Sequence, residues 1–250
     1  MNPVRRASVV VAALLLAVMT FACKSKNDAG VMGQTSGSAP ANPAAPARAM
    51  LPSVPPLSPA QIAEALRPPQ GSKIAIEVFE DLQCPSCAHD EADFEQASKA
   101  YHAPIVRHDF LIPVHNWSPE AHTIARYFDS ISPQLGDEFR RYIFANQTAI
   151  TKQNLREKTD QFASQHGQQL PTFYDPAGAF KAKVDADFKL GLGMGVHQTP
   201  TVYISRLRPD GSVDYIELQK IEELMPVLAQ AVQMEKQESA SASGKKRAAQ

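Results

Sequence analysis

Two cysteines separated by Pro85 and Ser86 constrain this chain more than any other feature. They follow an apolar run from Ile74 to Phe79, which predicts a strand, and a helical pattern begins at Pro85. Proline at the first helical position is pre-organised and loses no hydrogen bond. The sequence therefore predicts a strand–turn–helix unit, with Cys84 at the N-cap of the helix and Cys87 one turn later.

The N-cap position favours the thiolate form of Cys84. The first-turn N–H groups and the positive end of the helix macrodipole point at its sulfur. Such sites lower a thiol pKa from roughly 8.5 into the range of about 3.5–7.5. Because the thiolate is the nucleophile, Cys84 is the candidate attacking cysteine and Cys87 is the candidate resolving cysteine.

A CxxC pair can also be half of a structural zinc site, or two inert buried thiols. Such zinc sites need a second cysteine pair or suitably spaced histidines. The chain has one further cysteine, Cys23, and His89 follows Cys87 too closely for a zinc finger. We therefore expect redox chemistry at the pair, with no metal and no organic cofactor.

The N-terminus has the features of an export signal. Arg5 and Arg6 precede an uncharged, mostly apolar run from Ala7 to Ala22. That run is shorter than the ~18–20 residues of a membrane-spanning helix. It ends at Cys23 and resembles a bacterial lipoprotein signal, in which this cysteine becomes lipidated. We predict a signal peptide at 1–22 and a lipid-anchored protein of the periplasm or cell envelope; an ordinary secretory signal or an uncleaved anchor is the alternative.

Composition divides the remaining chain. Residues 23–57 are rich in Ser, Gly, Ala and Pro and predict a disordered tether, because such a segment buries too little apolar surface to fold. The folded domain is expected from Ser58 to about residue 236, followed by a disordered tail at 237–250. The net charge of −1 gives no electrostatic footprint of nucleic-acid binding, so no nucleic-acid partner is expected.

Apolar periodicity predicts the order β-α-β, a helical insertion, and then β-β-α. The Gly-rich segment at residues 191–195, after the insertion, is expected to be a flexible approach to the loop before the next strand. The predicted elements are a short helix from Ser58 to Leu66, a strand from Ile74 to about Glu80, a helix from Pro85, a strand at Ile105–Ile112, helices within about 118–190, strands near Thr201–Ser205 and Val213–Leu218, and a helix at about Ile221–Met234.

Two segments resemble the DsbA-like proteins of the thioredoxin superfamily. Residues 78–87 resemble the active-site segment, and residues 195–201 resemble a loop in which Thr precedes a cis-proline packed against the redox cysteines. The resemblance implies an α/β, thioredoxin-like fold with an inserted helical subdomain. It also implies thiol–disulfide oxidoreductase activity, with Thr199 and Pro200 binding substrate across a cis peptide bond.

Acidic residues precede the cysteines, and a buried one could accept the Cys87 proton during resolution of a mixed disulfide. Glu80 and Asp81 are the candidates; a surface or structural role is the alternative. The expected partners are protein substrates carrying thiols or disulfides and a redox recycling partner. The sequence leaves the direction of exchange open, and it leaves two other functions: a non-catalytic binding lipoprotein and a metal-handling protein.

Overall fold

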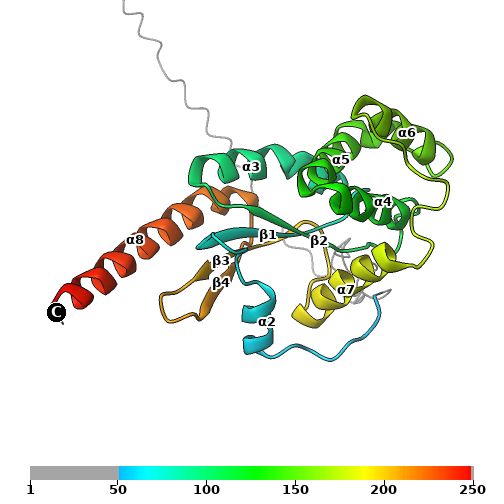
Figure 1. The fold of residues 1–250 in the computed structure, drawn as a ribbon. Coiled ribbons are helices and arrows are strands. Elements are labelled where there is room, and N and C mark those ends of the chain that lie inside the picture. Colours follow the sequence, from blue (N-terminus) through cyan, green and yellow to red (C-terminus); the bar gives the residue numbers. More distant parts are fainter. Residues whose placement is uncertain (1–50, 249–250) are drawn as a thin grey trace, which may run out of the picture. The chain divides into compact units, whose positions relative to one another are not determined.

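The structure, a computed structural model, describes residues 51–248 (Figure 1). One mixed sheet has the strand order β2-β1-β3-β4. The central strand β1 (Ile74–Glu80) runs parallel to β2 (Ile105–Asp109) and antiparallel to β3 (Thr201–Leu207). The edge strand β4 (Val213–Glu217) pairs antiparallel with β3.

Helices cover both faces of the sheet. Figure 1 shows α3 and α8 on one face and α2 and α7 on the other, while α4, α5 and α6 gather at one end. This arrangement confirms the predicted α/β fold with a helical insertion. The bounds are α2 Pro59–Ala65, α3 Pro85–Tyr101, α4 Ser118–Ile131, α5 Pro133–Asn146, the 3₁₀ turn η1 Gln147–Ala149, α6 Leu155–Gln165, α7 Ala179–Met194, the 3₁₀ turn η2 Ile221–Glu223 and α8 Leu224–Ala248.

Successive side chains of β1 point to opposite faces of the sheet and pack against the helices on each face. All seven β1 residues are buried, as expected for a strand covered on both faces. Val78 packs with Phe94 of α3 and Leu228 of α8. Phe79 points to the opposite face and packs with Phe110. The strand therefore holds its C-terminal end, where the cysteine pair follows, between two packed layers.

The helical insertion has its own aromatic core. The rings of Phe128, Phe139 and Phe162 have centroids 4.9–5.2 Å apart. The same buried cluster continues to Cys84 and Cys87. The cysteine pair consequently lies where the core of the insertion meets the sheet.

Two element ends differ from the sequence prediction. β2 ends at Asp109 and not at Ile112, because its neighbour β1 has already ended at Glu80. The Gly-rich segment is not a flexible loop: α7 continues to Met194. Gly191 lies so close to the sheet layer that a Cβ there would come within 2.5 Å of the Phe110 ring.

The domain also extends further at both ends than predicted. Leu57, placed in the tether from the sequence, donates its N–H to the Gly193 carbonyl at 2.8 Å. At the other end α8 runs to Ala248, so the predicted end near Met234 and the disordered tail after it were wrong. The tail is rich in Ala and Ser and also contains Gln, Lys, Arg and Glu; apart from Ser, these residues favour helix even without an apolar stripe. An ion pair of 2.7 Å between Glu238 and Arg206 of β3 also holds it.

The predicted signal peptide at 1–22, Cys23 and most of the tether lie outside the described residues. Within residues 51–248, no helix combines the length and the apolar character needed to cross a bilayer.

Candidate active site

Cys84 occupies the N-cap of α3, as predicted. Its backbone is extended, with φ −79° and ψ 120°, and Pro85 is the first helical residue. The Cys84 N–H donates to the Asp81 carbonyl at 2.9 Å, which closes a tight turn between β1 and α3. Both thiols are free and buried, with exposed fractions of 7% for Cys84 and 1% for Cys87.

Neighbouring donors lower the pKa of Cys84 to about 6. The largest contribution is a hydrogen bond from the Cys87 thiol; burial opposes it, and the Thr199 side chain and the N–H groups of Cys87 and Ser86 add to the lowering. The N–H groups are those that the N-cap prediction invoked, although the Cys87 thiol contributes more. Cys84 is therefore largely a thiolate at neutral pH.

Cys87 has the opposite character. Burial raises its pKa well above the ordinary thiol value, and the neighbouring Cys84 and the charge of Glu80 raise it further. Cys87 consequently remains a protonated donor while Cys84 is ionised. The two sulfurs differ in the sense required of an attacking and a resolving cysteine.

The Thr199–Pro200 peptide bond is cis, which confirms the prediction made for this loop. The loop lies against the cysteine pair, since the Cys84 thiol donates to the Thr199 carbonyl at 3.2 Å. The Thr199 hydroxyl is buried and has no hydrogen-bond partner among the described residues, so it is free to donate to a Cys84 thiolate.

A groove of about 280 Å³ opens beside this loop. It brings together the start of α3, the segment before β3, and the segment between β4 and α8. Its lining residues are Ser86, Asp90, Gln198, Thr199, Pro200, Thr201, Val202, Glu217, Leu218, Gln219, Lys220 and Ile221.

The two candidate acids have different surroundings. Glu80 is 1% exposed, and its Oε2 accepts from Arg107 Nη1 at 2.7 Å. Arg107 also donates to both carboxylate oxygens of Glu91, so one guanidinium joins two buried acids. The other oxygen of Glu80, Oε1, has no hydrogen-bond partner among the described residues, and Arg140 Nε lies 3.9 Å from it. Glu80 thus keeps one buried oxygen that can accept a proton.

The oxygens of Asp81 are occupied. Oδ1 accepts from the Gln83 N–H at 2.8 Å and Oδ2 accepts from the Ile112 N–H at 2.7 Å, with His115 Nδ1 3.0 Å from the same oxygen. Burial opposes ionisation of Asp81, but His115, His122 and the Ile112 N–H together hold its pKa below the usual range. Asp81 therefore shapes the turn before Cys84, and of the two acids only Glu80 retains a free acceptor.

Two further residues near the cysteines were not predicted from the sequence. His122 of α4 is fully buried; its Nε2 accepts from the Leu82 N–H at 3.0 Å and its Nδ1 lies 2.7 Å from Asp109. Gln147 Nε2 donates to the carbonyls of Leu82 and Cys84, each at 3.0 Å. A histidine on the apolar face of α4, next to Ala121, was a detectable signal for His122. No sequence pattern marks Gln147.

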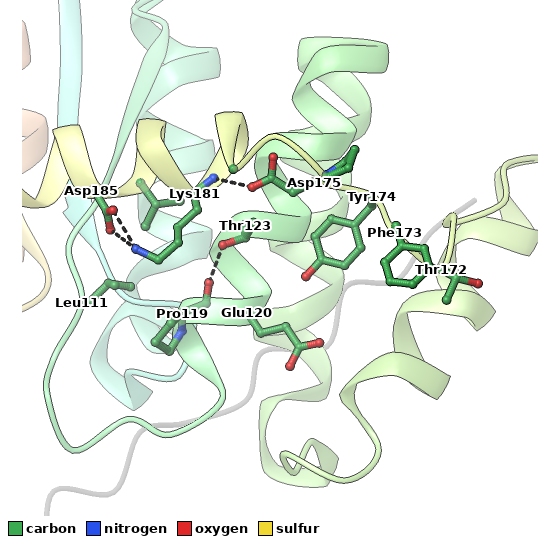
Figure 2. A pocket seen from close by; sticks show the side chains of 13 residues that line it. Leu111, Pro119, Glu120, Thr123, Thr172, Phe173, Tyr174, Asp175, Lys181 and Asp185 are labelled. Atoms are coloured by element: carbon green, nitrogen blue, oxygen red, sulfur yellow. Dashed lines mark hydrogen bonds and ion pairs between the residues drawn. The ribbon is translucent and has the colours of Figure 1, made fainter.

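A separate cavity of about 490 Å³ lies beside the starts of α4 and α7 (Figure 2). Its charged groups largely engage one another: Lys181 Nζ contacts Asp185 at 2.6 Å, and Asp175 accepts the Lys181 N–H at 2.9 Å. Figure 2 shows these contacts on one wall of the cavity, with Phe173 and Tyr174 on the adjoining loop. Neither cysteine lines this cavity.

Within the described part of the chain, no three His, Cys, Asp or Glu side chains are arranged to hold a metal ion. The metal-handling alternative therefore has no supporting geometry among residues 51–248. Cys23 lies outside this part, so its predicted lipidation stays a prediction.

Comparison with known proteins gives the same fold. The sequence model of a family described as Thioredoxin matches residues 70–223, more than half of the chain. No curated protein sequence matches.

Solved structures with the same fold include two Wolbachia pipientis proteins and one from Proteus mirabilis. The thiol-disulfide exchange protein α-DsbA2 of Wolbachia pipientis shares 14% identity with a TM-score of 0.53, covering 68% of this chain and 90% of that one. α-DsbA1 of the same organism shares 12% identity with a TM-score of 0.54, covering 67% of this chain and 89% of that one. ScsC of Proteus mirabilis, in a transitional conformation, shares 12% identity with a TM-score of 0.52, covering 67% of this chain and 71% of that one. The chain belongs to the thioredoxin superfamily and has a DsbA-like fold.

Proposed function

We propose that this protein is a thiol–disulfide oxidoreductase that exchanges disulfides with protein substrates through Cys84 and Cys87. One observation carries the proposal: a thiol with a pKa of about 6 and a thiol with a strongly raised pKa share one helix turn beside the Thr199 carbonyl. Neither an inert pair nor a binding surface needs that difference between the two sulfurs.

The first step is attack by the Cys84 thiolate on one sulfur of a substrate disulfide. A mixed disulfide forms between Cys84 and the substrate, and the second substrate sulfur leaves as a thiolate. Ionised Cys84 needs no base for this step, because its hydrogen-bond donors already favour the thiolate. The groove beside Thr199 would receive the substrate as an extended segment, in the manner of strand addition.

The second step requires the Cys87 proton to be removed. Cys87 then attacks the Cys84 sulfur, the Cys84–Cys87 disulfide forms, and the remaining substrate sulfur leaves as a thiolate. Glu80 is the proposed proton acceptor, because its charge acts on Cys87 and its Oε1 is buried without a donor among the described residues. The reverse sequence oxidises substrate thiols, so both directions use the same residues.

Capture of mixed disulfides tests this function. In Cys87→Ser the resolving sulfur is absent, so substrates should remain linked to Cys84 and appear on a non-reducing gel as adducts that a reductant releases. The expected result is accumulation in Cys87→Ser and none in Cys84→Ser. The organism's own envelope fraction supplies the candidate substrate proteins for this test.

Adducts in Cys84→Ser but not in Cys87→Ser would reverse the two assigned roles. Adducts in neither variant, with both proteins folded, would leave the non-catalytic binding lipoprotein as the better account.

We also propose that the chain is exported and anchored through Cys23. The support is the N-terminal sequence, in which a basic pair and an apolar run precede this cysteine. Mass spectrometry of the mature protein should find residues 1–22 removed and Cys23 carrying lipid. An unmodified Cys23, or a mature N-terminus elsewhere, would reject the anchor and leave the redox proposal intact.

A further inference from the structure

The turn of Asp81–Cys84, between β1 and α3, is held by side chains of the helical insertion. Leu82 is fully buried, and both of its main-chain polar groups are paired outside the turn. Its N–H donates to His122 Nε2 and its carbonyl accepts from Gln147 Nε2, both at 3.0 Å. The position of the turn therefore depends on the insertion as well as on the flanking strand and helix.

Gln147 reaches the reactive cysteine itself. The same Nε2 that contacts Leu82 donates to the Cys84 carbonyl at 3.0 Å. A side-chain amide nitrogen carries two hydrogens, so one Gln147 side chain can make both contacts. The Cys84 carbonyl also accepts from the Ala88 N–H at 3.2 Å, the first hydrogen bond of α3. Gln147 thus binds the N-cap residue at the point where the helix starts.

The backbone of Gln147 is anchored on both sides. It is the first residue of η1, directly after α5, and its neighbours Phe144 and Ile150 are buried in the core of the insertion. The Gln147 N–H donates to Phe144 and its carbonyl accepts from Ile150. The amide is consequently presented to the turn from a packed element.

We infer that Gln147 is a positioning residue for Cys84, which holds the N-cap backbone so that the sulfur faces its thiolate-stabilising donors. Those donors are the thiol of Cys87, the Thr199 side chain, and the N–H groups of Cys87 and Ser86. Rotation of the Cys84 peptide would carry the sulfur away from them. The importance of Gln147 for catalysis rests on the proposed function, whereas its effect on the thiolate can be measured separately.

The test is the pH dependence of Cys84 alkylation by a small reagent in reduced Gln147→Leu, compared with wild type. Leucine keeps a similar volume and removes both donated hydrogen bonds. We expect the midpoint to rise by about one pH unit, which lowers the rate at the wild-type midpoint roughly fivefold as the thiolate fraction falls. Well above both midpoints the rates should be similar, because both proteins are then fully ionised.

Gln134→Leu is the matched control. Gln134 lies at the start of α5, the helix that directly precedes Gln147, where its exposed side chain donates to Glu138 at 2.9 Å, so its loss should leave the midpoint unchanged. Gln147→Lys restores hydrogen-bond donors and adds a positive charge, and it should return the midpoint to the wild-type value or below. Denaturant unfolding of each variant reports stability separately.

An unchanged midpoint in Gln147→Leu, with or without a loss of stability, would overturn the inference. If that variant does not fold, Gln147→Lys decides: a midpoint above the wild-type value would contradict a donor role. Because alkylation needs no substrate protein, a shifted midpoint with no trapped adducts would reject the proposed function and retain the positioning role.

Discussion

Replacing Cys84 with serine is expected to lower disulfide exchange by at least about 10³-fold, to the background rate. A serine hydroxyl is neither ionised near neutral pH nor able to form a disulfide. Cys87 cannot take over, because burial keeps it protonated and raises its pKa. The measurement is the rate at which reduced protein releases thiol from a small aromatic disulfide.

Cys87→Ser should behave differently in the same assay. It retains the first attack by Cys84, so each protein molecule should release one equivalent of thiol rapidly and then stop. Wild type should release two equivalents, since Cys87 resolves the mixed disulfide. Two equivalents from Cys87→Ser without added thiol, or a fast first equivalent from Cys84→Ser, would contradict the division of roles.

Replacing Arg107 with methionine is expected to destabilise the protein by about 3–5 kcal/mol, as is typical when one partner of a buried ion pair is removed. The Arg107 side chain is 4% exposed and lies 2.7 Å from both Glu80 and Glu91. Without it, two buried acids lose their counter-charge. Denaturant unfolding of the oxidised proteins measures the loss.

Arg141→Met is the matched control, because Arg141 joins α5 to Glu95 of α3 at 3.0 Å with 36% of its side chain exposed. Loss of this exposed ion pair should lower the free energy of unfolding by less than about 1 kcal/mol. Burial raises the pKa of Glu91 to about 6, and the loss of Arg107 should raise it further, so the loss of stability in Arg107→Met should be smaller at pH 5 than at pH 7. A cost equal to that of Arg141→Met would show that the buried cluster contributes little.

Much of the fold could be predicted because local signals agree along the chain. The apolar run at Ile74–Glu80, the Pro85 helix start and the Thr199–Pro200 loop each have a specific sequence pattern, and the structure has all three. The end of α8 was missed because Ser/Ala-rich sequence was read as disorder, although Ala, Glu and Lys favour helix. The end of β2 depends on where β1 stops, and its own residues carry no signal for that.

The residues that surround the cysteines were harder to predict. Glu80 and Asp81 are adjacent acids, and only tertiary contacts separate them: Arg107 pairs with one oxygen of Glu80, while backbone donors and His115 occupy Asp81. Gln147 follows Cys84 by more than 60 positions and reaches it through the packing of α5. Such long-range contacts leave no local pattern in a single sequence.

The low pKa of Cys84 makes only a limited contribution to the reduction potential of the cysteine pair, and so to the direction of disulfide exchange. It exists only in the reduced protein, so a pKa of about 6 instead of about 8.5 stabilises the reduced form and makes the pair more oxidising. This stabilisation is complete above pH 8.5 and is lost as the pH falls through 6. At pH 7 it amounts to about 1.4 kcal/mol, or about 30 mV. The reduction potentials of thioredoxin and DsbA differ by roughly 150 mV, which is much more than this contribution. Other interactions and the recycling partner must therefore set the direction of disulfide exchange.

Titration of the thiolate absorbance of the reduced protein tests the central claim most directly. We predict one thiol with a midpoint near pH 6, absent in Cys84→Ser, and a second thiol that stays protonated beyond the ordinary value of about 8.5. A low midpoint that persists in Cys84→Ser would assign the reactive sulfur to Cys87. Two ordinary midpoints near 8.5 would contradict the account.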